Sequence, residues 1–292
     1  MMTVKAFIKR HPVLTYYTLV FAISWGGILM LIGGPSNIPG TAEQVGSLFS
    51  FALIALFAGP SIAGILMNYL VDGREGLRKL KLRLLQWRVA PRWYAVALLT
   101  GPLSVAAVLF GLSLFSQGFL PGIVTEKDKV TLVLFGIAWG FIGGGLLEEL
   151  GWTGFAVPRL RQHYSILVTG LIVGFLWGVW HFLIAFWSSN SLSGESSLAM
   201  FVAGFLPFYL VALPAYRVLM VWVYDRTGNL PVSMLMHAIL SASTLILQPL
   251  ATGVISLIWN LVLAIVLWVI VAAVALANRG KLSRKPLLGR MA

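Results

Sequence analysis

Two adjacent glutamates, Glu148 and Glu149, lie inside a stretch of sequence that is otherwise apolar. No other charged residue occurs in residues 131–157. A carboxylate at the centre of a membrane costs about 2.5–3.5 kcal/mol on insertion scales, so two in succession require a compensating role. Carboxylates in such a setting can act as general acid and base, or as oxygen ligands of a metal ion.

Two of the four histidines, His181 and His237, also fall within long apolar stretches, whereas His11 and His163 lie beside charged segments. An imidazole can exchange a proton near neutral pH or bind zinc. Taken singly, each buried histidine could simply form a hydrogen bond between helices. Together with the glutamate pair, His181 and His237 indicate an acid–base site or a set of zinc ligands.

Arg217 is the one basic residue that falls within an apolar span. Because an unpaired charge at this depth is unfavourable, we expect its guanidinium to form an ion pair with Glu149. The alternative is that the side chain extends to the cytoplasmic interface near Asp225. A separation above about 8 Å from both carboxylates would contradict the ion pair.

The geometry of a helix separates the roles of the two glutamates. Adjacent helical residues point about 100° apart, so we expect Glu148 and Glu149 to face different partners, one at the reacting centre and one in support. Three glycines at 143–145 predict that a neighbouring helix approaches closely just before the pair. Trp152 and Trp177 add bulk and indole N–H groups nearby, although packing is the commoner role of such side chains.

The composition places these residues in a membrane protein. Of the 292 residues, 59% are hydrophobic and 10% are charged, whereas soluble domains carry about 25% charged residues. The chain has no cysteine, which excludes disulfides and thiolate sites. The net charge of +12 does not indicate nucleic-acid binding, because the basic residues lie beside hydrophobic segments, as the positive-inside rule describes.

Eight segments are long and apolar enough to span a bilayer, which takes about 20 residues. They are residues 13–33, 47–71, 93–115, 131–157, 166–187, 199–224, 231–248 and 254–277. Continuous apolar runs indicate helices rather than the alternating strands of a barrel. We therefore predict an all-α membrane protein, a single domain over 1–292 formed by a bundle of about eight transmembrane helices.

The distribution of basic residues predicts the orientation. Eighteen of the 21 Lys and Arg residues lie in the termini and in the loops at 72–92, 158–165 and 225–230. The positive-inside rule then predicts a multi-pass protein of the cell membrane with both termini cytoplasmic. Leucines alternate with basic residues in 72–92, which is typical of an amphipathic helix at the membrane surface, and 279–292 would form a basic cytoplasmic tail.

Three motifs carry a resemblance to a known family. The sequence Glu-Glu-Leu-Gly-Trp-Thr-Gly at 148–154 resembles the EExxxR motif of the CAAX protease and bacteriocin-processing (CPBP) family of intramembrane proteases, which includes the type II CAAX prenyl endopeptidases. Trp177 and His181 resemble the second motif, in which an aromatic residue precedes a histidine by four positions. The segment from His237 to Ser241 resembles the third motif, HxxxN. The resemblance extends over about residues 45–245.

The resemblance implies endopeptidase activity within the membrane, on a membrane-anchored peptide such as a prenylated CAAX-type C-terminus. It assigns activation of water to Glu148 and His181, and stabilisation of the oxyanion to His237 and Ser241. Members of this family have been argued to be metalloproteases or metal-free glutamate proteases. If zinc is used, the resemblance makes Glu148, His181 and His237 its candidate ligands.

Two positions depart from the motifs. Thr153 replaces the arginine that would support Glu149, and Ser241 replaces the asparagine of the third motif. A serine hydroxyl can still donate a hydrogen bond, and Arg217 could supply the missing charge. These departures also suit a catalytically degenerate relative that acts as a membrane scaffold or peptide-immunity factor. A third possibility, a proton-coupled transporter, is disfavoured because the sequence has no internal repeat.

The positions of the candidates along their spans set a condition on the site. At 1.5 Å per residue, Glu148, His181 and His237 would lie about 15, 22 and 9 Å from the cytoplasmic ends of their spans. Convergence then requires helices that tilt or that start at different depths. We expect the site to open toward the cytoplasm.

Overall fold

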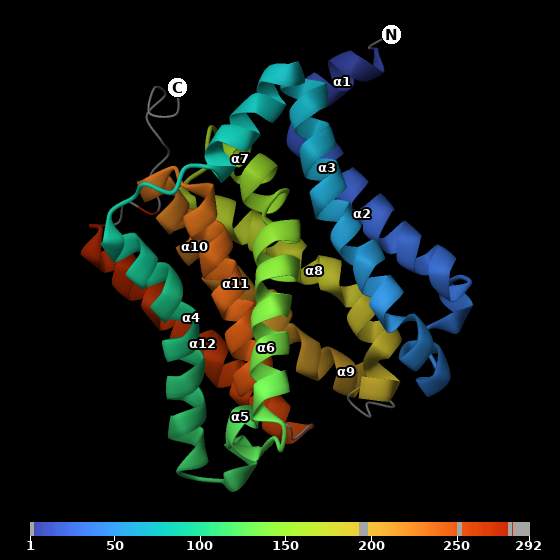
Figure 1. Ribbon diagram of the computed structural model, residues 1–292, viewed down its shortest axis with the longest axis vertical. Helices are drawn as coiled ribbons and strands as arrows, with labels where there is room; N and C mark the ends of the chain where they lie inside the picture. The colour runs from blue at the N-terminus through green and yellow to red at the C-terminus, as the bar shows by residue number, and fades with distance from the viewer. Residues whose placement is uncertain (1–2, 193–197, 250–252, 280–281, 283–292) are drawn as a thin grey trace.

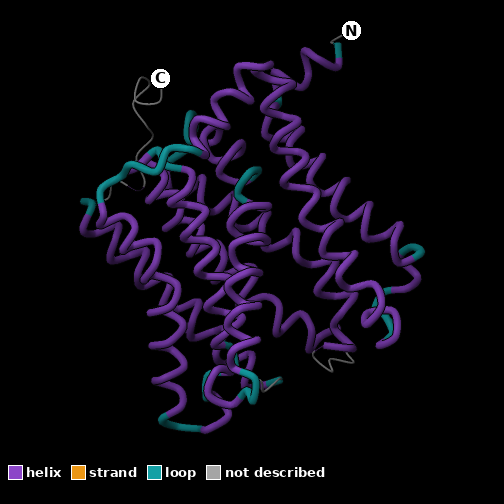
Figure 2. The backbone as a smooth tube through the Cα atoms, viewed as in Figure 1, coloured by secondary structure: helices purple, strands orange, loops and turns teal. Residues whose placement is uncertain are grey.

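The computed structural model describes residues 3–192, 198–249, 253–279 and 282. Every regular element in this part of the chain is helical, and none of these residues lies in a strand. Figure 1 shows the resulting bundle of long helices, and Figure 2 shows that the loops gather mainly at its two ends. The predicted all-α fold is confirmed.

Eight helical segments are long and apolar enough to cross a membrane, in agreement with the sequence. They are α2 (Pro12–Ile32), α3 (Ala42–Leu84), α4 (Pro91–Ser113), the composite Lys129–Leu160, α8 (Ile166–Leu192), the composite Phe201–Thr227, α11 (Leu230–Leu247) and α12 (Val254–Ala277). The first composite contains α6 (Lys129–Trp139), η3 (Gly140–Glu148), η4 (Trp152–Ala156) and α7 (Val157–Leu160); the second contains α9 (Leu198–Phe205), η5 (Leu206–Ala212) and α10 (Leu213–Thr227). The remaining short elements are α1 (Val4–Arg10), η1 (Pro35–Asn37), η2 (Gln117–Phe119) and α5 (Gly122–Thr125).

Local sequence determines where several spans begin and end. Pro12 occupies the first turn of α2, where its missing N–H would have had no helical partner. Gly33 and Gly228 terminate α2 and α10 with φ of 80° and 61°, a left-handed conformation that glycine adopts without steric cost. Thr41 begins α3 with a capping box that includes Gln44.

The basic segment 72–92 is helical over its first part. Gly73 departs from helical geometry with φ 64° and ψ −150°, and the helix then continues to Leu84 before residues 86–90 adopt an irregular path. The predicted basic tail at 279–292 lies almost wholly outside the described residues.

The bundle has two chemically different ends. The basic end carries α1, residues 74–92, 158–165 and 225–230; the opposite end carries the connections between α2 and α3, α4 and α6, and α11 and α12. In Figure 1 the basic end is uppermost, and both α1 and the last turn of α12 lie there. The assignment of the basic end to the cytoplasm stays a prediction from the positive-inside rule.

Close helix contacts bring four elements around one point. Gly170 and Gly174 of α8 face α10, where a Cβ would lie 2.5 Å from the Cα of Val218 and of Pro214 respectively. Glycine therefore lets the two backbones approach. Element η3 packs against α11, and α10 packs against both α8 and α11. These four elements surround the glutamate pair.

Candidate active site

The glutamate pair lies where the fourth span leaves regular α-helical geometry. Residues Gly140–Glu148 and Trp152–Ala156 form π-helical turns, and Glu149 to Gly151 connect them. A π-turn widens the helix and changes the direction of the side chains that follow, and such turns are frequent at functional sites. Adjacent side chains in such a turn still point in different directions, and the two glutamates have different partners, as predicted.

Glycine makes room for the neighbouring helix, as predicted. A Cβ on Gly144 would lie 2.6 Å from Ser241 Oγ and 2.9 Å from His237 Nε2. A Cβ on Gly145 would lie 2.9 Å from the carbonyl oxygen of Met234 on the same helix. All three distances are shorter than real Cβ contacts allow, so η3 can approach α11 this closely because these positions have no side chain.

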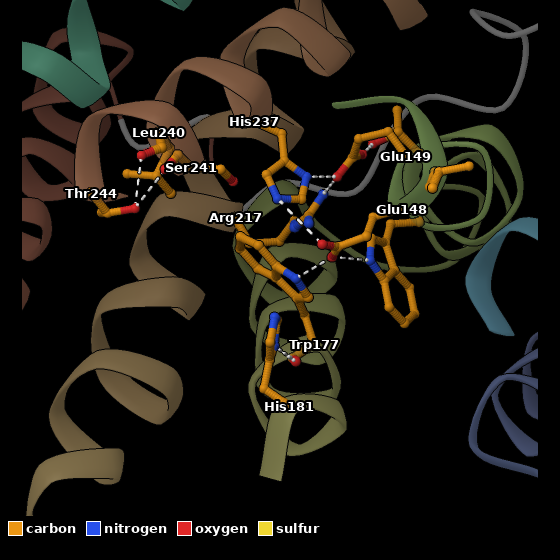
Figure 3. Close-up of polar contacts among 12 residues, drawn as sticks. Glu148, Glu149, Trp177, His181, Arg217, His237, Leu240, Ser241 and Thr244 are labelled. Carbon is orange, nitrogen blue, oxygen red and sulfur yellow. Dashed lines mark hydrogen bonds and ion pairs between the residues drawn. The ribbon is translucent and has the colours of Figure 1, made fainter. Parts of the chain in front are cut away.

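Glu149 is fully buried and its carboxylate is surrounded by donors (Figure 3). Its Oε1 accepts hydrogen bonds from Arg217 Nη1 at 2.7 Å and from His237 Nδ1 at 2.7 Å, and Thr153 donates its hydroxyl to Oε2. The predicted ion pair with Arg217 is therefore present. Both carboxylate oxygens are thus hydrogen-bonded, whereas Nε and Nη2 of Arg217 are buried without a hydrogen-bond partner among the described residues. Removal of either member of such a buried pair would leave the other charge uncompensated.

Arg217 also contacts the surroundings of the other glutamate. Its guanidinium carbon lies 4.3 Å from the centroid of the Trp177 ring, a cation–π contact. The indole of Trp177 in turn donates to Glu148 Oε2 at 2.6 Å. Arg217 thus holds one carboxylate directly and contacts a donor of the other.

Glu148 faces a cavity, with 3% of its surface exposed. Trp152 Nε1 donates to its Oε2 at 3.1 Å, beside the bond from Trp177. Its Oε1 lies 4.0 Å from His237 Nε2. This separation exceeds a direct hydrogen bond, and one water molecule bonded to both groups would span it.

His237 lies between the two carboxylates. Its Nδ1 contacts Glu149 and its Nε2 is directed toward Glu148, as Figure 3 shows. The ring packs edge-on against Trp177 with the centroids 4.7 Å apart. A histidine with one nitrogen anchored by a carboxylate has a fixed ring orientation, which leaves the other nitrogen available for proton exchange.

His181 lines the same cavity but lies apart from the glutamates. Its Nδ1 bonds to the carbonyl oxygen of Trp177 at 2.9 Å, and its ring lies 5.0 Å from that of Tyr209. In the described part of the chain, no direct polar contact joins His181 to Glu148. His181, for which the sequence predicted the greatest distance from the cytoplasmic end of its span, lies farther along the cavity. Glu148 and His237 lie close together.

Ser241 follows His237 by one helical turn and also lines the cavity. Among the described residues no hydrogen bond engages its hydroxyl, while its carbonyl accepts a bond from Thr244. The hydroxyl is therefore able to donate to a bound group.

Sequence reasoning underestimated the tryptophans and missed Tyr209. Trp152 and Trp177 are buried, as packing residues would be, and they also supply both hydrogen bonds to Glu148 Oε2. Tyr209 of η5 lines the cavity beside His181. Its position inside a long apolar span gave no signal, because several other aromatic residues occur in the same span.

The positions of the histidines and carboxylates show whether these side chains could hold a metal ion together. In residues 3–192, 198–249, 253–279 and 282, no group of three or more His, Asp or Glu side chains is placed to hold one. Glu148 and His237 come near each other, whereas His181 lies farther along the cavity with Nδ1 bonded to its own helix, which leaves its Nε2 free among the described residues. The side chains as placed do not fit the zinc set of Glu148, His181 and His237.

Comparison with known proteins tests the predicted resemblance to the CPBP family. Residues 129–243 match the family model described as type II CAAX prenyl endopeptidase Rce1-like. The predicted resemblance is confirmed. Over 200 residues the chain is 28% identical to CAAX prenyl protease 2 of Methanococcus maripaludis, an alignment that covers 67% of this chain and 65% of the relative. All the candidate site residues lie inside the segment matched to the type II CAAX prenyl endopeptidase family, and Thr153 and Ser241 remain its departures from the motifs.

Proposed function

We propose that the chain is an intramembrane endopeptidase that hydrolyses a peptide bond in a membrane-anchored polypeptide. One observation carries the proposal: Glu148 and His237 face each other across 4.0 Å at a buried cavity, while Glu149 holds the other nitrogen of the imidazole. The similarity to type II CAAX prenyl endopeptidases supports the same reaction class.

In the proposed mechanism a water molecule binds between Glu148 Oε1 and His237 Nε2. Glu148 accepts a proton from this water as its oxygen adds to the carbonyl carbon of the substrate. The carbonyl oxygen becomes an oxyanion, to which the hydroxyl of Ser241 donates. Collapse of the tetrahedral intermediate breaks the C–N bond, and Glu148 returns the proton to the leaving amine.

The supporting residues act through position. Glu149 orients the imidazole of His237, and Arg217 with Thr153 keeps that carboxylate in place. Trp152 and Trp177 fix Oε2 of Glu148, which leaves Oε1 directed to the water. This preorganisation replaces the solvent reorganisation that the same reaction requires in water.

The resemblance assigns water activation to Glu148 with His181, whereas the geometry favours Glu148 with His237. In the proposal His181, farther along the cavity, contacts the bound polypeptide. We therefore expect His181→Ala to impair substrate binding more than the chemical step, and His237→Ala to impair the chemical step.

A cleavage assay with purified protein in detergent or liposomes tests the proposal. Glu148→Ala and His237→Ala should abolish cleavage of a membrane-anchored peptide, and His163→Ala, an exposed histidine at the basic end, should not. Cleavage that persists in both site variants would contradict the mechanism. A folded wild-type protein that binds peptides and cleaves none would support the scaffold alternative.

A further inference from the structure

The cavity at Glu148 extends to one end of the bundle. It has a volume of about 520 Å³ and reaches from Gly144 and Glu148 to Ser188 at the end of α8, Gln248 after α11 and Val254 at the start of α12. These last positions belong to the opposite end of the bundle, away from the basic loops. The expectation that the site opens on the basic side is therefore not met in the described part of the chain.

Along one side, the turn that carries the glutamate pair is covered by packed backbone of α3. The hydroxyl of Ser61 donates to the carbonyl oxygen of Leu147 at 2.5 Å, and a Cβ on Gly64 would lie 2.7 Å from Gly151 Cα. Helix α3 thus lies directly on the turn that holds the two glutamates.

Toward the basic end, the end of α3 packs over the following turn of the span that carries the glutamates. Arg83 donates from Nη2 to the carbonyl oxygen of Gly154 at 2.6 Å and from Nη1 to the hydroxyl of Tyr224 at 3.2 Å. A separate cavity at the basic end is lined by residues such as Lys79 and Arg161. None of the described residues that line it also lines the cavity at Glu148.

The lining of the site cavity indicates what it can bind. Among its described lining residues, Glu148 is the single Asp, Glu, Lys or Arg. Aromatic side chains such as Phe57, Phe205 and Tyr209 form much of its wall, with hydroxyl and amide groups near the open end. Such a surface suits an apolar, uncharged segment of polypeptide, and it offers no cation to a terminal carboxylate.

We infer that the substrate reaches Glu148 from the end opposite the basic loops, and that it is an apolar, uncharged polypeptide segment presented at the extracytoplasmic side. This deepens the proposed endopeptidase function and rests on it. The side follows from one observation and one prediction: the cavity extends away from the basic loops, and the positive-inside rule predicts that those loops are cytoplasmic. An exported peptide or the outer end of a transmembrane segment has this chemistry.

Single-cysteine labelling tests the direction of access, since the natural chain has no cysteine. Gln248→Cys and Gln86→Cys are a matched pair of exposed glutamines, one lining each cavity. In intact cells, a membrane-impermeant maleimide should label the Gln248→Cys protein and should label the Gln86→Cys protein only after the membrane is opened. The reverse pattern would overturn the inference.

A third variant tests whether water reaches the interior from that side. Thr244→Cys lies deeper in the cavity, one turn beyond Ser241. A small charged methanethiosulfonate should modify it in intact cells. Leu103→Cys, on the lipid-exposed surface of α4, is the control that should stay unmodified. Modification of Thr244→Cys only through opened membranes would contradict the proposed path.

Proteoliposomes test the substrate class. Cleavage of a membrane-impermeant apolar peptide added outside should increase with the fraction of molecules whose residue 248 is labelled from outside. Cleavage that instead follows the labelling of residue 86 would overturn the direction of access. If neither orientation cleaves, the endopeptidase function and the substrate class fail together, and the labelling pattern still decides the direction of access.

Discussion

Glu148 and Glu149 are neighbours in sequence, yet their carboxylates meet different partners. Glu149 is enclosed by Arg217, Thr153 and His237, whereas Glu148 keeps one oxygen directed to the cavity. The pairing with Arg217 could be predicted by elimination, because the sequence holds one basic residue inside a span. The partner of Glu148 could not, because it depends on the π-turns and on how far along α8 and α11 the histidines lie.

Replacement of Glu148 by glutamine tests its role as a base. In Glu148→Gln the side-chain oxygen can still accept from Trp152 and Trp177, but the residue can no longer accept a proton. We expect the cleavage rate to fall by about 10²–10⁴-fold, the usual contribution of a positioned acid–base group, with the melting temperature maintained. A rate within a few fold of wild type in a folded variant would contradict the assignment.

The buried pair of Glu149 and Arg217 allows a double-mutant cycle. Arg217→Met leaves a buried carboxylate without its counter-charge and should cost about 3–5 kcal/mol of unfolding free energy. Adding Glu149→Gln removes the uncompensated charge, so the double variant should be more stable than Arg217→Met alone. Denaturation in detergent measures both, and strictly additive losses would show that the two side chains are not coupled.

Metal removal tests the remaining question about the chemistry. Because the described His, Asp and Glu side chains form no group of three around one point, we expect chelation and dialysis to leave the cleavage rate unchanged. Rate measurements before and after dialysis, with metal analysis of the same samples, check this. Activity that is lost and then restored by zinc would require His181 to turn toward Glu148.

At the scale of elements, the eight spans could be predicted from the lengths of the apolar segments, because a bilayer requires about 20 apolar residues for each helix. It did not indicate that the fourth span changes to π-turns at Gly140 or that the sixth does so at Leu206. The first of these π-turns, η3, packs against α11. The π-turns decide where the site residues point.

A substitution at Gly144 tests the close contact between η3 and α11. Gly144→Ala would place a Cβ within 3 Å of both Ser241 and His237, so we expect a large loss of activity as His237 is displaced. The matched control is Gly26→Ala in α2, where a Cβ would meet nothing within 4 Å. There, alanine should be neutral or stabilise the helix by up to about 1 kcal/mol. Equal activities of the two variants would contradict the close packing of η3 on α11.

At the scale of the molecule, the basic segment after Gly73 is part of the folded bundle. Arg83 bonds to both Gly154 and Tyr224, so the end of α3 fastens the glutamate-bearing turn to α10. From the sequence these charges indicated topology and an amphipathic surface helix, because Arg83 is indistinguishable from its basic neighbours until the chain folds back. The direction of the cavity was likewise beyond the sequence, as it depends on which helices separate.

Two arginines of the same basic segment show whether Arg83 stabilises the fold or acts only as a surface charge. Arg83→Ala removes two hydrogen bonds and should lower the unfolding free energy by about 1–3 kcal/mol. Arg88→Ala, at an exposed position, should change it by less than about 0.5 kcal/mol. Thermal unfolding of both variants in one detergent gives the comparison, and equal shifts would mean that Arg83 acts only as a surface charge.

The ion pair between Glu149 and Arg217 joins residues from two spans that are far apart in the sequence. A genome search that requires arginine four positions after the second glutamate would pass over proteins built in this way. A search that accepts any small residue there, provided that a lone arginine occurs inside a later apolar span, would retrieve them. Such a search would recover chains that lack the motif's arginine but supply an equivalent arginine from another span.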